Sequence, residues 1–206
     1  IMDKHYSENF LKPIQYRPFD NRWIYYDPEI ISRPATKAMK HLVFKQNLSL
    51  SLKRQSKFDF SYSFIHRSIC ESCLFESAYA NNTEFPLYLY PKANGQQLIE
   101  QYTERKPNLK AEIIKQIAEC MGLIFTSEKQ PTENTFAPLD ILDYIYAILH
   151  SPSYRETYKE FLKIDFPRVP YPKDKETFWQ LVKLGGEIRQ LHLLESPQLN
   201  NYITSY

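Results

Sequence analysis

The sequence is poor in glycine and cysteine, and it lacks the short motifs that many enzyme classes carry. Its 4 glycines, set against 14 prolines, argue against glycine-rich phosphate loops and favour stiff connections. With 3 cysteines and no secretory signal pattern at the N-terminus, we expect a reducing cytoplasm rather than a disulfide framework. No apolar run reaches the roughly 18 residues of a membrane-spanning helix, so we expect no membrane partner.

The remaining composition is that of a globular protein. Hydrophobic residues make up 43% of the 206 positions and charged residues 24%, values typical of a chain that buries a core. At this length we expect one domain or two small ones. The chain begins with Ile1 rather than methionine, from which we expect a piece of a longer polypeptide.

Positive charge is concentrated in one segment, 33–67. Eight basic residues face the single acid Asp59, which gives 8 − 1 = +7, whereas residues 71–206 hold 14 basic against 18 acidic residues, or −4. The net charge of +2 therefore combines a strongly basic segment, 33–67, with an acidic second part of the chain, 71–206. A cationic surface on a strand-containing module is typical of proteins that contact a polyphosphate backbone, provided that the cations gather on one exposed face.

Hydrophobic periodicity divides the chain into two parts. Alternation over 48–53 and 58–64 predicts two strands with one buried and one polar face, and shorter strands are predicted at 23–26 and 86–91, with a short helix after Ser32. Beyond residue 94 the period becomes helical, with helices predicted from Asn108 to Gly122, at 138–150, after Ser153 and over 174–194. We therefore predict an α+β fold, with a small mixed β module (1–92) followed by a helical layer (93–206) that braces it.

The last predicted helix contains Gly185 and Gly186 in its interior. Each mid-helix glycine costs about 1 kcal/mol relative to alanine. We therefore expect close packing of this helix against another backbone.

Candidate catalytic and metal-binding groups are sparse. His66, Cys70 and Cys73 have spacing that zinc sites use, but a second CxxC is absent and the remaining Cys120 lies in a predicted helix. We favour semi-buried structural thiols over zinc. The five histidines are scattered without a nucleophile-plus-base pattern, and the acids of the 138–150 helix suit its dipole rather than acid–base chemistry.

Residues 53–57 are a polar cluster, Lys-Arg-Gln-Ser-Lys, at the tip of the predicted hairpin. Arginine and glutamine can read guanine and adenine edges in the major groove, while lysine and serine more often contact phosphate. An ordinary solvated turn would also be polar, so this segment alone does not decide between the two. Arg17, in the aromatic segment before it, is expected to pair with Asp20.

Several segments together resemble a known family. In order and spacing, the chain is similar from about Tyr16 to Glu195 to the C-terminal target-recognition region of type ISP single-polypeptide restriction–modification enzymes and to related adenine-specific DNA methyltransferases. The segments that carry the resemblance are YRPFDNRWIYY, RPATKAMKHL, NLSLSLKRQ, EFPLYLYP, RKPNL, IAECMGL, LDILDYIYAILHSPSYRETYKEFLKIDFPRVP and FWQLVKLGGEIRQLHLLE.

The resemblance implies a module that selects the DNA site for a larger bacterial enzyme. That parent would bind S-adenosylmethionine, with ATP and Mg²⁺ as further candidates. The helical half (93–206) would brace the β module and dock it to the parent's methyltransferase domain. The sequence itself carries no Asn/Asp-Pro-Pro-Tyr/Phe motif, methyl-donor loop or Walker loop, so we expect no catalysis and no bound cofactor in this piece. The YRPFD segment is interpreted as architectural, and base reading is expected in the loops at 53–57 and 66–73.

We therefore predict sequence-specific recognition of double-stranded DNA. Groove contacts are predicted for Lys53, Arg54 and Gln55, and phosphate contacts for a second set of cations. That second set is Lys37, Lys40, Lys45, Lys57 and Arg67. Two other functions stay open at this point: a protein–protein scaffold built on the helices, and a metal-dependent nuclease.

Overall fold

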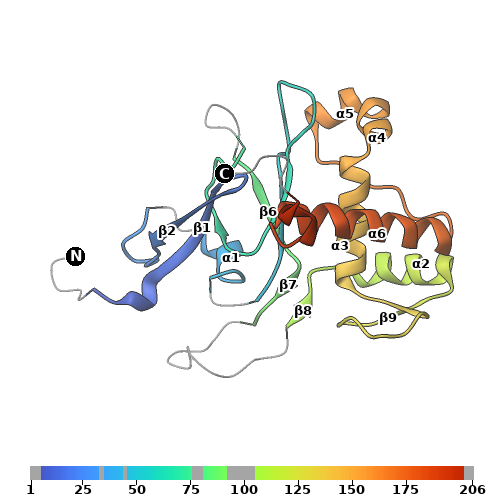
Figure 1. Ribbon diagram of the computed structural model, residues 1–206, viewed down its shortest axis with the longest axis horizontal. Helices are drawn as coiled ribbons and strands as arrows, with labels where there is room; N and C mark the ends of the chain where they lie inside the picture. Colours follow the sequence, from blue (N-terminus) through green and yellow to red (C-terminus); the bar gives the residue numbers. More distant parts are fainter. Residues whose placement is uncertain (1–5, 33–34, 44–45, 76–80, 92–104, 202–206) are drawn as a thin grey trace.

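The α+β class predicted from the sequence is confirmed by the computed structural model, in which small sheets lie beside a helical layer (Figure 1). The structure describes residues 6–32, 35–43, 46–75, 81–91 and 105–201. Within these ranges, no helix is long and apolar enough to cross a membrane.

Two three-stranded sheets form the β part, with strand orders β2-β1-β5 and β4-β3-β6. Both are largely antiparallel, except that β5 pairs parallel with β1. Two-stranded pairs, β7 with β8 and β9 with β10, complete the strands. Their bounds are β1 Leu11–Arg17, β2 Asp20–Tyr25, β3 Ser49–Leu52, β4 Ser63–His66, β5 Ile69–Cys70, β6 Thr83–Pro86, β7 Tyr88–Leu89, β8 Lys106–Pro107, β9 Ile124–Phe125 and β10 Thr135–Phe136.

The helices follow mainly in the second half, where α3 and α6 cross and pack against each other (Figure 1). The predicted helices over 138–150 and 174–194 are confirmed, and Gly122 ends α2 in a left-handed conformation as expected. The helix bounds are α1 Thr36–Met39, α2 Ala111–Met121, α3 Pro138–His150, α4 Pro152–Thr157, α5 Lys159–Ile164 and α6 Lys175–His192, with 3-10 turns at Glu8–Phe10 and Pro197–Asn200.

Two predicted helix starts are displaced. Asn108 does not begin α2, because its side-chain amide donates to the carbonyl of Pro86 at 2.9 Å, and the helix starts three residues later. The third helix is capped by Ser151 rather than Ser153, since the Ser151 hydroxyl accepts from the backbone N–H of Tyr154.

The predicted strand at 58–64 is wrong over most of its length. Residues 53–62 form a loop, and β4 begins only at Ser63. The expectation of a polar outer face on β3 is also wrong, because β3 is the central strand of its sheet and all four of its residues are buried. Ser49 and Ser51 have no exposed surface, since both hydroxyls donate to the carboxylate of Glu84.

Two hydrophobic cores hold the molecule together. The larger contains β3 and β4 residues such as Leu50 and Ile65 together with Leu149 and Phe178 from the helices, so it lies on both sides of position 92. The smaller contains Phe64, Met39 and other residues of the first half. A division into two parts at residue 92 stays a prediction, and the larger core is shared between those parts.

Candidate nucleic-acid interface

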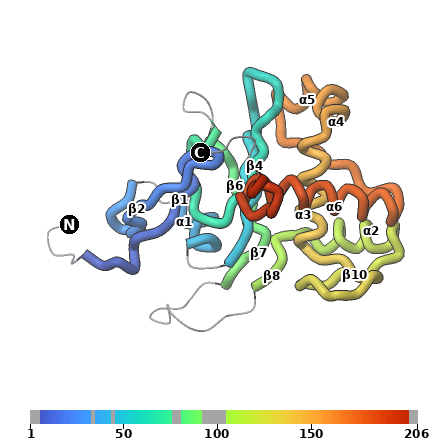
Figure 2. Tube along the Cα trace, viewed as in Figure 1, coloured from blue at the N-terminus to red at the C-terminus, as the bar shows by residue number. Residues whose placement is uncertain are grey.

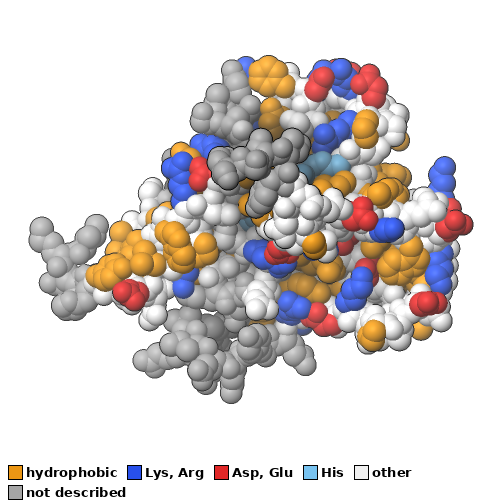
Figure 3. All heavy atoms as spheres, in the orientation of Figure 1, with side chains coloured by type: hydrophobic (Ala, Val, Ile, Leu, Met, Phe, Trp, Pro, Cys, Tyr) orange, Lys and Arg blue, Asp and Glu red, His pale blue; other side chains and the backbone are white. Residues whose placement is uncertain are grey.

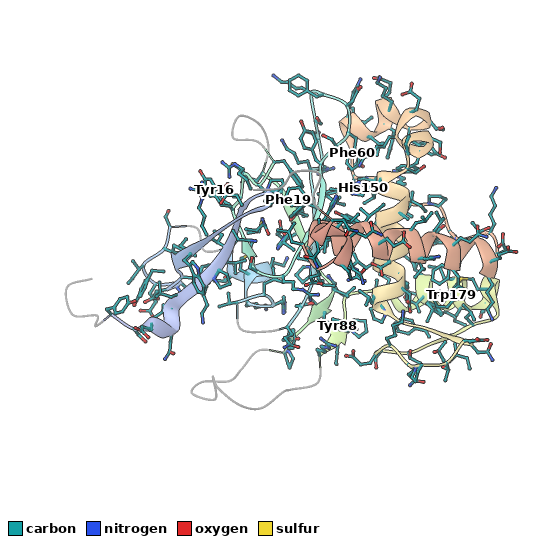
Figure 4. The ribbon with its side chains drawn as sticks, in the orientation of Figure 1. Tyr16, Phe19, Phe60, Tyr88, His150 and Trp179 are labelled. Carbon is teal, nitrogen blue, oxygen red and sulfur yellow. The ribbon has the colours of Figure 1, made fainter. Side chains whose placement is uncertain are left out.

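The loop between β3 and β4, residues 53–62, is the most protruding part of the predicted DNA-contacting segment (Figure 1). Its base is anchored by Phe60, which is 5% exposed and packs in the larger core (Figure 4). The backbone N–H of Ser56 donates to the carbonyl of Lys163 on α5 at 3.0 Å. This contact fixes the middle of the loop against the helical layer.

Ion pairs with the helical half complete this anchoring. Arg54 Nε donates to Asp165 Oδ1 at 3.1 Å. The Asp59 carboxylate forms ion pairs with Lys159 Nζ at 3.1 Å and Lys163 Nζ at 3.7 Å. Each exposed pair contributes at most about 1 kcal/mol, but several on one short loop restrict its conformations together. The backbone N–H of Phe166 and the Arg54 guanidinium lower the pKa of Asp165, so this carboxylate is charged at neutral pH.

The tip of the loop exposes Lys57 and Phe58. Gln55 beside them is also exposed, and its amide donates to the carbonyl of Ile164 at 3.5 Å. Phe58 is 59% exposed, and Ser56 Oγ holds it in a tight turn by accepting from its N–H and donating to its carbonyl, both at 3.0 Å. A large aromatic ring without cover, beside a lysine and an amide, matches the groups that nucleic-acid-binding loops use for stacking, phosphate and base-edge contacts. Sequence reasoning missed Phe58 because it assigned this residue to a strand.

Lys53 does not lie at the tip, and the expectation that it is exposed is wrong. Lys53 is 2% exposed, and its ammonium lies 4.8 Å from the centre of the Tyr62 ring, within cation–π range. A buried lysine supports the base of the loop and has no surface to offer a groove in this conformation.

Arg67 is exposed but paired with an acid of the helical half. Its guanidinium donates two hydrogen bonds to Glu195, at 2.7 and 3.0 Å. This bidentate pairing lowers the pKa of Glu195, and it neutralises part of the charge that the sequence assigned to DNA phosphates. Asp165 likewise neutralises part of the positive charge of Arg54, through a single ion pair.

The other predicted cations lie elsewhere or outside the described residues. Lys37 and Lys40 are exposed on or beside α1, which lies apart from the loop tip in Figure 1. Lys45 falls outside the described residues. The expectation that the surplus cations gather on one exposed face is therefore wrong for the six described ones. Lys53 is buried, Arg54 and Arg67 are paired with carboxylates, Lys37 and Lys40 lie on or beside α1, and Lys57 lies at the loop tip.

The second predicted reading loop, 66–73, is partly buried. His66 and Cys70 come together as the sequence suggested, but the third group is Glu84 and not Cys73; the ligand atoms of the three lie within 4.8 Å of one another. Cys73 is partly exposed near Asn81. Burial is the main reason that the pKa of the Cys70 thiol is raised, so without a bound metal this sulfur is protonated.

Hydrogen bonds already complete the shell of the Glu84 carboxylate. It accepts from Ser49, Ser51, Asn82 and His66 at 2.6–2.9 Å. Burial alone would raise the pKa of Glu84, but these donors, led by His66, lower it. His66 Nδ1 lies 2.8 Å from the carbonyl of Ser68 and Nε2 2.8 Å from the carboxylate, so both ring nitrogens face acceptors. The arrangement therefore fits a buried His–Glu pair without a metal.

A third cluster, which the sequence did not reveal, joins the β part to the helices. β4 lies against the C-terminal end of α6 (Figure 2). There the ring of Phe64 stacks on His192 with centroids 5.6 Å apart. Tyr146 contacts His192 Nδ1 at 2.5 Å, and Phe19 from the β1–β2 turn meets Phe64 edge-on at 5.3 Å. Phe19 has a φ of 64°, so this strained turn residue is held by its ring contacts (Figure 4).

The expected pairing of Arg17 with Asp20 is wrong. Asp20 accepts a bidentate pair from Arg22, and Arg17 donates to Glu71 at 3.0 Å. Both guanidiniums lie over the ring of Tyr16, at 4.2 and 3.8 Å from its centre. The segment is thus fixed by its own contacts, in agreement with an architectural role.

Comparison with known proteins gives one family over nearly the whole chain. The family model described as type ISP C-terminal specificity domain matches residues 2–206. No match was found among curated proteins.

Three similar solved structures share the fold. They are the ATP-dependent type ISP restriction–modification enzyme LlaBIII bound to DNA (22% identity, TM-score 0.68), a DrdV–DNA complex (23%, 0.69) and a nuclease-deletion mutant of the type ISP enzyme LlaGI with a DNA substrate mimic (21%, 0.62). The alignments cover 93%, 92% and 92% of this chain, but only 11%, 16% and 14% of those chains.

Proposed function

Because the chain belongs to the family of type ISP C-terminal specificity domains, we propose that it recognises a specific sequence in double-stranded DNA for a larger restriction–modification enzyme. The observation that carries the proposal is the anchored loop 53–62, which presents a lysine, an amide and an uncovered aromatic ring on a fixed support. Such pre-organisation lowers the entropy cost of binding and limits the orientations in which the tip meets a duplex.

The roles of the tip residues follow from their chemistry. Lys57 contacts phosphate, Gln55 reads a base edge, and Phe58 packs against bases or sugars. Lys159 and Lys163 on α5, which also bind Asp59, add positive charge beside the loop. Arg54 and Lys53 support the loop instead of reading DNA. Lys37, Lys40 and Lys45 stay candidates for phosphate contacts at a second place.

The parent enzyme is proposed to be an adenine-specific DNA methyltransferase of the cytoplasm with restriction activity. S-adenosylmethionine would be its methyl donor, with ATP and Mg²⁺ as further cofactors. The protein studied would contribute site selection, while the rest of the polypeptide would perform the chemistry.

Salt-dependent DNA binding by the full-length polypeptide tests the proposal. Lys57→Gln is expected to weaken binding to specific and generic duplexes alike and to reduce the slope of log K against log[salt] by about 1. Gln55→Ala is expected to reduce the preference for the cognate site, by about 1–3 kcal/mol at one base pair. Lys115→Gln, an exposed lysine on α2 away from the loop, is the matched control and leaves both unchanged.

A result in which both loop variants, Lys57→Gln and Gln55→Ala, bind like the wild type would reject the loop as the reading element. Absence of any salt-dependent affinity in the wild type would reject DNA recognition altogether and favour the scaffold function.

A further inference from the structure

The β1–β2 hairpin has one packed face and one uncovered face. Ile14 and Ile24 pack against the smaller core. On the opposite face the strand register places Leu11 beside Tyr25 and Pro13 beside Trp23. We call this second face the hairpin face; it consists of Tyr6, Leu11, Pro13, Trp23 and Tyr25.

The hairpin face is apolar and exposed. Trp23 is 73% exposed, Tyr6 66% and Leu11 37%, and Tyr6 stacks on Tyr25 with ring centroids 5.6 Å apart. Figure 3 shows hydrophobic side chains gathered over this end of the molecule. Burying a side chain of this size is worth about 1.5–3 kcal/mol, so a contiguous group of them favours a protein partner.

The charges of the hairpin argue against DNA as that partner. Lys12 and Arg22 alternate onto the other face, where Arg22 is held by Asp20 and lies over Tyr16. The hairpin face itself contains no cation. A DNA backbone would therefore meet apolar side chains at this face, with no positive charge to pair with its phosphates.

The family and the position of Tyr6 indicate which protein covers the face. Members of this family form the C-terminal part of their polypeptides, and the chain covers 11–16% of the solved chains that it matches. Tyr6 precedes β1 in the chain, and its ring stacks on Tyr25 of β2. The polypeptide that precedes this domain in such an enzyme therefore approaches at this face.

We propose that the hairpin face docks this domain onto the preceding part of the same polypeptide, with Trp23 as the central buried side chain. Tryptophan and tyrosine are the residues that most often anchor such contacts. Docking would then occur through the hairpin rather than through the helical half. This contact would hold the loop 53–62 at a fixed position relative to the rest of the enzyme.

Thiol labelling of the full-length polypeptide tests the proposal. Leu11→Cys and Pro13→Cys place a thiol on the hairpin face while Trp23 stays in place, and Ile124→Cys places one at an exposed site (66%) on β9. Maleimide labelling is followed for each peptide by mass spectrometry, without and with duplex DNA. Because Leu11 and Pro13 are exposed within the domain, these substitutions leave its own core intact.

Labelling at positions 11 and 13 is expected to be at least about tenfold slower than at 124 without DNA, as a face covered most of the time requires. Four outcomes would overturn the proposal. Equal rates would mean an uncovered face, slow labelling at 124 alone would assign docking to the helical half, protection only with DNA would make the face a DNA contact, and protection only at high protein concentration would indicate a second copy of the chain. These outcomes do not depend on the salt titration of the loop variants, so the two proposals are tested separately.

Discussion

Gly185 of α6 lies directly against the backbone of Asp143 on α3: a Cβ at position 185 would be 1.8 Å from the Asp143 carbonyl oxygen. The expectation that the glycine pair permits close backbone packing is confirmed at this residue. Arg189, one turn later, donates two hydrogen bonds to the Asp143 carboxylate at 2.6 and 3.1 Å. Burial raises the pKa of Asp143 even though Arg189 opposes the shift, so this pair is strongly desolvated.

Gly185→Ala is therefore expected to force α3 and α6 apart. Overpacking of this kind costs about 1–3 kcal/mol or more, which outweighs the roughly 1 kcal/mol that alanine gains in helix propensity. Gly186→Ala is the matched control, because its Cβ would be 3.2 Å from Oδ2 of Asp143, a much milder contact than the 1.8 Å backbone clash at position 185. Urea unfolding of the two variants checks this, and equal midpoints would contradict it.

The sequence predicted the helices well because their signals are local. Gly122 and Asp174 end and begin helices through their own backbone preference and side chain, and neither depends on the rest of the fold. β3 was found from its alternation, but its serines were placed on a solvent face, because alternation cannot show that Glu84 from a distant segment covers that face.

The candidate site was predicted less well, for a related physical reason. Charge counted along the chain ignores acids that return from the other half, and Asp165 and Glu195 do so at Arg54 and Arg67. The exposed ring of Phe58 was missed because apolar periodicity assigns such a residue to the interior. The cationic segment therefore has less charge available than its sequence predicts, and its role in DNA contact stays a prediction.

Folding stability is expected to fall below neutral pH because of His150. Its Nε2 lies 3.1 Å from Ser63 Oγ, and Nδ1 accepts from Arg155 at 3.2 Å, which requires the neutral ring. Burial, followed by the positive charges of Arg155 and His192, lowers the pKa of His150 to about 3. The unfolded state, with a pKa of about 6.5, therefore binds more protons between about pH 6.5 and 3.

Because the unfolded state binds more protons in this range, the contribution of His150 to the free energy of unfolding is complete above about pH 6.5. It is lost progressively as the pH falls toward 3. His150→Gln, whose amide does not titrate, is expected to flatten the pH dependence while lowering stability at pH 7. Urea unfolding at several pH values between 4 and 7.5 measures the difference. A variant with the same slope as the wild type would show that other groups, such as His41 and His192, determine it.

The Glu84 cluster is expected to stabilise the fold without a metal. Glu84→Gln replaces one acceptor oxygen by a donor that faces Ser49, Ser51, Asn82 or His66, and a buried unsatisfied contact costs about 1–3 kcal/mol. The melting temperature of the wild type should not change with EDTA or with added zinc. A rise with zinc that Cys70→Ala abolishes would show that a His66–Cys70–Glu84 site does bind the metal.

Asp59 allows the effect of charge on DNA binding to be tested apart from the effect of loop anchoring. It is a negative charge beside the predicted DNA-contacting tip, and it also anchors the loop to Lys159 and Lys163 of α5. Asp59→Asn removes the charge and weakens the anchoring. If charge alone mattered, specific and generic DNA would both bind more tightly, by similar factors.

We expect a different result, because the tip must be held in place to discriminate. Asp59→Asn should tighten binding to generic duplex at low salt, while the ratio of specific to generic affinity falls several-fold as the loop samples more orientations. Glu160→Asn, which removes a neighbouring exposed acid that contacts Lys163 but not the loop, is the control for charge and should leave the ratio unchanged. Equal ratios for Asp59→Asn and the wild type would mean that α5 does not position the loop, and base reading would then have to come from another part of the domain.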